Sequence, residues 1–296
     1  MVVLTSSVLK ISLPPTGVNI KLYGATKAIK DYFSLYSGST KSRVIYCYFL
    51  ALHGSALIIH QLAAEFPDIE FVVFVLDSSF KFVKPFMVGL PSNVKVYLAN
   101  IYKQGNKLVY GKMTVSLVGK PNSKKIVEYV DHSVDHEIAR YKSLCDFHRG
   151  NKDIISMKFG FAFDHPLFRV AMVDYFVKEF TGVDFSDIHY VRVVAGSGLM
   201  SLLLAQALKK LGIEDITFRL IQVGRHIYTS KHEKYYPTAV IKCPIGYNVP
   251  FDYNTMSGPE LHVLANLPYG YDTYCGKVFI EGIVRRTMFV IIRNGV

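Results

Sequence analysis

Three short segments of this sequence carry residue types at spacings that could do chemistry. In the first, Gly196-Ser197-Gly198 follows a β-branched run and precedes a leucine-rich stretch with helical spacing. Glycines at the start of a helix leave backbone N–H groups open to a phosphate, and the hydroxyls of Ser197 and Ser201 add donors. Because position 201 is not glycine and no P-loop lysine follows, we expect one phosphate group rather than a dinucleotide or a nucleoside triphosphate. The alternative is a tight turn without a ligand.

The second segment, Ser37 to Arg43, is a loop of small residues that presents Lys41 ahead of an apolar element. A lysine held near other cations and partly removed from water has a lowered pKa and can form a Schiff base. The alternative is an ordinary surface lysine. The third segment, Pro268 to Lys277, places Tyr274 and Cys275 among glycines and further tyrosines, which on its own is also typical of an aromatic turn.

The first segment lies inside the clearest structural pattern of the chain. Tyr190 to Val194 predicts a strand, and Leu199 to Leu211 predicts a helix that ends at Gly212. A second strand is expected over Ile216 to Val223. Strand, glycine loop, helix and strand in this order predict a βαβ unit of a doubly wound parallel sheet.

The first half of the chain predicts further strands and helices in alternation. We expect a half-buried strand over Val18 to Tyr23, the end of a helix at Phe66 and a buried strand over Ile69 to Leu76. Turn signals and charge between residues 102 and 125 predict a hairpin or a crossing segment. Pro166 to Phe180 predicts an amphipathic helix.

Composition narrows the partners and the compartment. The chain has 296 residues and a formal net charge of +11, which favours anionic partners such as a phosphate cofactor, nucleic acid or an acidic surface. Its four cysteines lie too far apart for a zinc or disulfide framework, and no third ligand joins His132 and His136, so we expect no metal. The longest apolar stretch, Val44 to Leu52, is too short to span a bilayer, and the N-terminus lacks the pattern of a signal peptide. We therefore expect a cytoplasmic protein.

Taken in order, the three segments resemble one family. The chain is similar to pyridoxal 5'-phosphate (PLP) enzymes of fold type II, the tryptophan synthase β-like group. Within that group it most resembles the branch of aminocyclopropane-carboxylate (ACC) deaminase and D-cysteine desulfhydrase. That branch runs from a first strand to a Gly-Gly-Asn-Lys-x-Arg segment, whose lysine holds the cofactor. Here Gly38-Ser39-Thr40-Lys41-Ser42-Arg43 matches it, so the resemblance implies Lys41 as the Schiff-base lysine.

Two later segments extend the resemblance. The family's glycine-rich phosphate loop is similar to Ala195-Gly196-Ser197-Gly198, with Ser201 just beyond it. The family's closing Tyr-(Thr or Glu)-Gly-Lys segment is similar to Tyr274-Cys275-Gly276-Lys277. The match implies that Tyr274 lies near the substrate and that Cys275 faces the pyridine nitrogen of the cofactor.

The sequence departs from the family at the segment that stacks against the cofactor. The family has Ser-Asn-His there, whereas the comparable junction in this chain is His53-Gly54-Ser55-Ala56. This junction follows Lys41 too closely to leave room for the helix and strand that the family places between them. We expect the substrate side of the site to differ from that of the family.

The resemblance implies an α/β chain of two Rossmann-like, three-layer α/β/α domains with mostly parallel sheets. A larger, cofactor-binding domain would comprise residues 1–30 and 126–296, and a smaller domain residues 31–125. The implied function is that of a PLP-dependent lyase or deaminase. Its substrate would be a small amino acid or an amino-acid-like group, free or attached to a nucleotide or DNA. The family tendency adds a homodimer.

Two other classes of function stay open. The net charge and the absent Ser-Asn-His segment favour a cofactor-free member of the same fold that binds nucleic acid or a protein partner. The loop at 196–198 also suits a Rossmann-like nucleotide enzyme, such as a transferase. The absorbance spectrum of the purified protein after addition of PLP separates the enzyme class from the binding class.

Overall fold

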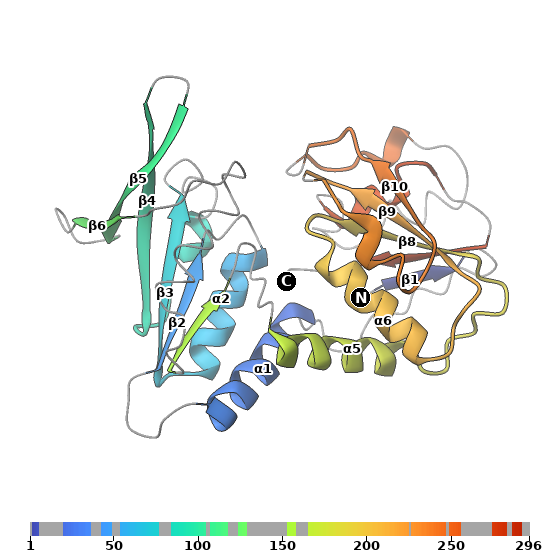
Figure 1. Cartoon of the computed structure of the whole chain (residues 1–296), viewed down its shortest axis with the longest axis horizontal. Helices are drawn as coiled ribbons and strands as arrows, with labels where there is room; N and C mark the ends of the chain where they lie inside the picture. The colour runs from blue at the N-terminus through green and yellow to red at the C-terminus, as the bar shows by residue number, and fades with distance from the viewer. Residues whose placement is uncertain are drawn as a thin grey trace. The chain divides into compact units, whose positions relative to one another are not determined.

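The computed structural model of the chain describes residues 2–5, 20–36, 43–48, 54–76, 84–104, 107–117, 124–128, 153–157, 165–224, 226–246, 249–255, 274–282 and 286–291. The chain divides into two compact units (Figure 1). Unit 1 is formed mainly by residues 1–20 and 169–294, and unit 2 by residues 21–168. The domain boundaries expected from the sequence, after residues 30 and 125, stay a proposal.

Unit 1 is built on a five-stranded sheet with the order β1-β11-β8-β9-β10. Strands β11, β8, β9 and β10 are parallel, and β1 runs antiparallel to β11 at one edge. The elements associated with this unit are β1 (Val2–Thr5), α5 (Pro166–Phe180), β8 (Tyr190–Ala195), α6 (Leu199–Lys210), β9 (Thr217–Gln222), η3 (Thr229–Lys231), β10 (Thr238–Lys242), η4 (Tyr253–Thr255), η5 (Cys275–Phe279) and β11 (Thr287–Ile291).

The predicted βαβ unit is present as β8, α6 and β9. Strand β8 is buried from Val191 to Ala195, as expected for a β-branched strand in the middle of a parallel sheet. Helix α6 starts after Gly198, whose φ of 78° is left-handed, and it buries a face that includes Leu203 and Leu208. The chain leaves the helix through Gly212, which has a φ of 75°. The glycines thus mark both ends of the helix.

Unit 2 is built on a six-stranded sheet with the order β6-β5-β4-β3-β2-β7. Strands β7, β2, β3 and β4 are parallel, and β5 and β6 continue the sheet in antiparallel pairing. The elements of this unit are α1 (Ile20–Tyr36), β2 (Arg43–Tyr48), α2 (Gly54–Glu65), β3 (Ile69–Leu76), η1 (Lys84–Met87), β4 (Val94–Gln104), β5 (Lys107–Leu117), β6 (Lys124–Glu128) and β7 (Ile154–Met157).

Most of the predicted elements are present in the structure. The end of α2 at Glu65, the strand β3 and the helix α5 match the predictions for these stretches. The hairpin expected between residues 102 and 125 corresponds to the antiparallel strands β4 and β5.

The strand predicted over Val18 to Tyr23 is wrong, because α1 begins at Ile20. Its buried side chains include Ala25, Ala28 and Ile29, whose spacing of three and four residues is that of one helix face. A stretch of six residues can fit both the two-residue repeat of a strand and the 3.6-residue repeat of a helix. Here the helical repeat continues over many more residues, and the stretch is part of a helix. None of the helices in the described ranges has the length and hydrophobicity that a bilayer span requires.

Candidate functional site

The candidate site lies at the carboxyl edge of the sheet in unit 1. Strands β8, β9 and β10 are parallel, so the residues that follow them meet at one edge. Gly196 follows β8, Val223 follows β9 and Cys243 follows β10. In open parallel α/β sheets this edge is where ligands bind.

The glycine loop has no room for side chains. A Cβ atom on Gly196 would lie 3.1 Å from the hydroxyl oxygen of Tyr274. A Cβ atom on Gly198 would lie 3.3 Å from Cγ2 of Ile227 and 3.4 Å from Cε1 of His232. A side chain at 196 would need Tyr274 to shift, and glycine at 198 suits both the close neighbours and the left-handed backbone.

The start of α6 supplies the electrostatics of the loop. Gly198 is the N-cap residue and offers no side-chain cap, so the first backbone N–H groups of the helix are those that an anion would use. Ser197 is exposed, and its Oγ lies 3.5 Å from the N–H of Leu199, at the limit of a hydrogen bond. The helix dipole adds a partial positive charge at this end. The loop can bind one phosphate group through its main chain.

Ser201 lies beneath this loop and is almost wholly buried. Its Oγ lies 2.9 Å from the carbonyl oxygen of Gly198 and 2.9 Å from Nε2 of His232. The serine hydroxyl has a single hydrogen, which it donates to the carbonyl oxygen of Gly198. The Nε2–H group of His232 therefore donates to the serine oxygen. The role of Ser201 as a cofactor contact stays a prediction, and its observed partners are within the protein.

No local pattern of the sequence points to His232 as a residue of this region. It is buried, and its Nδ1 atom has no hydrogen-bond partner in the described part of the chain. Burial lowers the pKa of His232, while the Gly198 carbonyl and Glu233 act in the opposite direction. The imidazole is 31 residues from Ser201 in the sequence, and no motif spacing connects the two.

The C-terminal segment contributes the wall beside the loop. Tyr274 is half-buried and points its hydroxyl at Gly196, and η5 begins directly after it. Lys277, three residues on, is wholly buried, and its Nζ donates to the carbonyl oxygen of Gly246 at 2.6 Å. Burial lowers the pKa of Lys277, and the nearby thiols of Cys243 and Cys275 oppose that shift.

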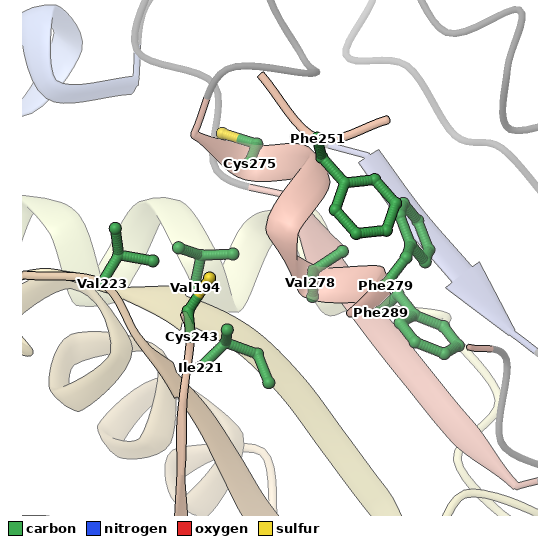
Figure 2. Close-up of a cluster of buried hydrophobic side chains, with 9 residues drawn as sticks. All are labelled: Val194, Ile221, Val223, Cys243, Phe251, Cys275, Val278, Phe279 and Phe289. Carbon is green, nitrogen blue, oxygen red and sulfur yellow. The ribbon is translucent and has the colours of Figure 1, made fainter. Parts of the chain in front are cut away.

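Cys275 belongs to a cluster of buried hydrophobic side chains. Figure 2 shows it at one end of the η5 ribbon, with Val278 and Phe279 further along the same ribbon. The side chains that complete the cluster are Val194, Ile221, Val223, Cys243, Phe251 and Phe289. Cys275 is thus packed among hydrophobic side chains, with Lys277 also near its thiol, and a thiol is only a weak donor or acceptor.

Arg192 connects the central strand to the C-terminal segment. It is wholly buried on β8, and NH1 donates to the carbonyl oxygens of Gly282 at 3.2 Å and Val278 at 3.5 Å. NH2 pairs with Glu281 at 3.1 Å, and the guanidinium lies over the ring of Phe289. Burial lowers the pKa of Arg192 and Glu281 raises it. The segment that carries Tyr274 is thus fixed to the strand that carries the glycine loop.

The structure accounts for part of the predicted site. Gly196 and Tyr274 are brought into direct proximity, and Ser197, Ser201 and Cys275 lie around them on unit 1. Lys41 lies outside the described residues, as do His132 and His136.

Lys27, the reserve candidate for the Schiff base because it follows the stretch expected as the first strand, is described. It is exposed on α1, with Nζ 3.9 Å from a carboxylate oxygen of Asp31. That pairing is typical of a solvated helix face. Nothing about Lys27 distinguishes it as a site residue.

These residues fit the phosphate end of PLP. The cradle of Gly196 and Gly198, which a Cβ atom would fill, and the start of α6 match a phosphate monoester. The hydroxyl of Tyr274 beside Gly196 adds a polar group at the same place. For the pyridine end the chain offers Cys275, a weaker partner than the Thr or Glu of the family.

Comparison with known proteins supports the fold. No family model matches the sequence, and no curated protein matches it. Among solved structures, the chain is similar to one described as an ACC deaminase homologue, with 14% identity and a TM-score of 0.51 over 89% of this chain and 73% of that chain. The chain therefore has the tryptophan synthase β-like fold, and the resemblance to fold type II enzymes is confirmed at the level of the fold.

Two further similarities are weaker. A diaminopropionate ammonia lyase from Escherichia coli has 14% identity and a TM-score of 0.43, over 77% of this chain and 56% of that chain. A PLP-dependent aspartate racemase has 11% identity and a TM-score of 0.37, over 69% of this chain and 46% of that chain. This chain thus spans about half the length of these two structures, and at these TM-scores they support no conclusion of their own.

Proposed function

We propose that this protein is a PLP-dependent lyase or deaminase that acts on an amino acid or an amino-acid-like group. The observation that carries the proposal is the glycine loop at the start of α6, with the Tyr274 hydroxyl directed at Gly196. A phosphate-binding loop of this kind at the carboxyl edge of a parallel sheet, in this fold, is where the phosphate of such a cofactor would be held.

Each residue has a distinct role in the proposal. The main chain of Gly196 to Gly198 and the N-terminus of α6 hold the phosphate, and Ser197 is placed to add a hydroxyl at the surface of the loop. Tyr274 orients the ligand beside Gly196. PLP, when bound, supplies an electron sink for the bonds at the substrate Cα. A neutral thiol at the ring nitrogen, from Cys275, favours elimination or deamination over transamination.

The lysine that holds the cofactor is assigned to Lys41 by the sequence resemblance, and the order of elements offers a second candidate. The family places a helix and a strand between its lysine and the next strand-to-helix junction. In this chain that junction, at the start of α2, is preceded by α1 and β2. By that order the family lysine would fall near the start of α1, where Lys21 is the second residue.

The experiment is the addition of PLP to the purified protein, followed by borohydride reduction and peptide mapping of the lysine that carries the pyridoxyl group. We expect a new visible absorbance band and a label on Lys41 or, by the order of elements, on Lys21. Substitution of the labelled lysine by Ala abolishes the band, whereas Lys27→Ala, on an exposed helix face, leaves it unchanged. The absence of any spectral change with PLP contradicts the proposal.

A cofactor-free protein of the same fold is the second candidate, and the burial of Cys275 within a hydrophobic cluster favours it. In that case the glycine loop would bind an anion without further chemistry. Inorganic phosphate would then bind, and PLP would bind no more tightly than phosphate. The remaining finer assignments, a substrate attached to a nucleotide or DNA, a homodimer and a cytoplasmic location, are proposals that follow from the resemblance and the charge.

A further inference from the structure

The positive charge of this protein is concentrated in one segment of the chain. Residues 78–127, called the lysine segment below, contain nine lysines, no arginine and no acidic residue. The rest of the chain contains 25 Lys and Arg against 23 Asp and Glu, so it is close to neutral. The lysines of the segment are Lys81, Lys84, Lys95, Lys103, Lys107, Lys112, Lys120, Lys124 and Lys125.

The topology of unit 2 places the strands of this segment next to one another in a single sheet. Strands β4, β5 and β6 are consecutive neighbours in the order β6-β5-β4-β3-β2-β7. The acidic residues of the six strands are Glu70 on β3 and Glu128 on β6. Glu70 forms an ion pair with Lys95, and Glu128 is the register partner of Lys112. The other lysines of β4, β5 and β6 have no acidic residue opposite them in the strand register.

Part of this sheet extends as a two-stranded ribbon. Strand β3 pairs with β4 only as far as Ala99, and β6 pairs with β5 only over residues 112–116. Residues 102–104 of β4 and 107–111 of β5 lie past these pairings and form the ribbon, in which the register pairs of the described residues are Lys103 with Leu108 and Gln104 with Lys107. Figure 1 shows the two strands reaching beyond β3. The register shifts between Ile101 and Lys103, where an irregularity increases the local twist.

A two-stranded ribbon that concentrates like charges is unfavourable in isolation. Ribbons of two strands are at best marginally stable in water, and an excess of like charge on adjacent strands adds electrostatic repulsion. A polyanion laid along the strands would remove that repulsion. Eleven residues of strand span about 35 Å, which is the length of several phosphates of an extended nucleotide chain.

We propose that strands β4, β5 and β6 form a docking surface for single-stranded nucleic acid. The lysines supply the charge that binds phosphates, and Tyr102 and Tyr110 on the same ribbon are of the residue type on which unpaired bases stack. The lysines run along paired strands and not along a helix with an apolar face, which is the arrangement that binds membrane surfaces. The surface belongs to unit 2 and does not depend on the proposed function of the loop in unit 1.

The test uses the full chain and a fluorescently labelled oligothymidylate of about 20 nucleotides, which exceeds most single-strand site sizes. Fluorescence anisotropy measures the affinity over a series of salt concentrations from about 50 to 300 mM. The variant K103Q/K107Q/K112Q, called the ribbon variant, removes two charges from the ribbon and that of Lys112, the next residue of β5. The matched control K231Q/K234Q/K242Q removes three charges from exposed lysines of unit 1.

We expect the wild type to bind with a strong salt dependence. The ribbon variant loses at least about tenfold in affinity. Its salt slope falls by about 2, because each lysine–phosphate contact on a single strand releases less than one counterion when it forms, and the variant lacks three lysines. The control changes affinity less than about twofold, and the K103R/K107R/K112R variant retains wild-type binding because the charge is kept. Circular dichroism checks that each variant is folded.

Three results would overturn the proposal. They are undetectable binding at the lowest salt, equal losses in the ribbon variant and its control, and binding to phosphatidylserine vesicles in the absence of any binding to the oligonucleotide. The last result would assign the surface to a membrane. None of them bears on whether PLP binds to unit 1, so failure of this proposal is separate from failure of the proposed function.

Discussion

The close approach of Tyr274 to Gly196 makes the glycine loop sensitive to a single added carbon. In Gly196→Ala the new Cβ atom meets the tyrosine oxygen at 3.1 Å, closer than ordinary van der Waals contact. We expect PLP affinity to fall about tenfold, the equivalent of about 1.4 kcal/mol. The double variant G196A/Y274F relieves this contact but also removes the hydroxyl from the ligand, so it should recover only part of the affinity, as measured by spectrophotometric titration.

A control for this prediction uses a glycine with the same backbone demand and no neighbour. Gly182 has a φ of 83°, and a Cβ atom there would meet nothing within 4 Å. Gly182→Ala is therefore expected to lower stability slightly through backbone strain and to leave PLP affinity unchanged. If G196A binds PLP as well as the wild type does, Tyr274 does not border the ligand.

His232 gives the protein a pH-dependent stability. Burial holds its pKa in the folded state below that of an ordinary histidine, so the unfolded state binds more protons in this range. The contribution of His232 to the free energy of unfolding is therefore fully present above about pH 6.5. It falls as the pH decreases below that value, by at most about 1.4 kcal/mol per pH unit. The midpoint of thermal unfolding, measured between about pH 7.5 and 5.5, reports this loss.

The matched control is the exposed His226. His232→Gln removes the titrating group, keeps an N–H that can donate to Ser201, and should flatten the pH dependence. His226→Gln should behave like the wild type. An unchanged pH profile in the His232 variant would mean that other groups set the acid sensitivity.

At the scale of elements, Arg192 holds the segment 278–282 against β8. Glu281 is partly exposed, whereas the Arg192 guanidinium is wholly buried. Glu281→Gln leaves a buried cation without its counter-charge, and we expect a loss of about 3 kcal/mol. In R192M/E281Q the buried cation is absent, so the double variant should be more stable than E281Q alone.

Urea unfolding of E281Q, of R192M and of the double variant R192M/E281Q measures the coupling between the two side chains. A double variant whose loss equals the sum of the single losses would show that the two side chains act independently. The same variants report on the site, because η5 follows Tyr274 directly. Weaker PLP binding in E281Q at temperatures where it is fully folded would identify the ion pair as positioning the Tyr274 segment.

At the scale of the whole molecule, each unit has a buried core of its own. Leu204 in α6 of unit 1 and Leu62 in α2 of unit 2 are both wholly buried helical leucines. Each Leu→Ala substitution is expected to cost about 2–5 kcal/mol. By calorimetry, we expect L204A to lower one unfolding transition and L62A to lower another. A single transition that both variants shift equally would show that the units unfold together.

Local patterns of the sequence determined the βαβ unit of residues 190–223. The strand follows from its β-branched residues, the turn from its two glycines and the helix from its leucine-rich stretch. Because each of these causes is local, the order of the elements can be predicted from the sequence. The same is true of the tight glycine loop at Gly196 and Gly198, whose anion binding stays a proposal, whereas the place of Tyr274 was implied by the family resemblance. The prediction was wrong at Val18 to Tyr23, where a short stretch fitted both a strand and a helix. The buried face of α1 extends well beyond those six residues.

Tertiary structure alone decided which side chains meet around the loop. Ser201 meets His232 over 31 residues and Arg192 meets Gly282 over 90, and no local pattern encodes such pairs. The lysine segment shows the same division. Its charge is plain in the sequence, but only the sheet order β6-β5-β4 places the strands that carry most of those lysines next to one another. Strand pairing brings together residues that are far apart in the sequence. Which strands pair, and in which register, depends on how the whole unit buries its hydrophobic side chains.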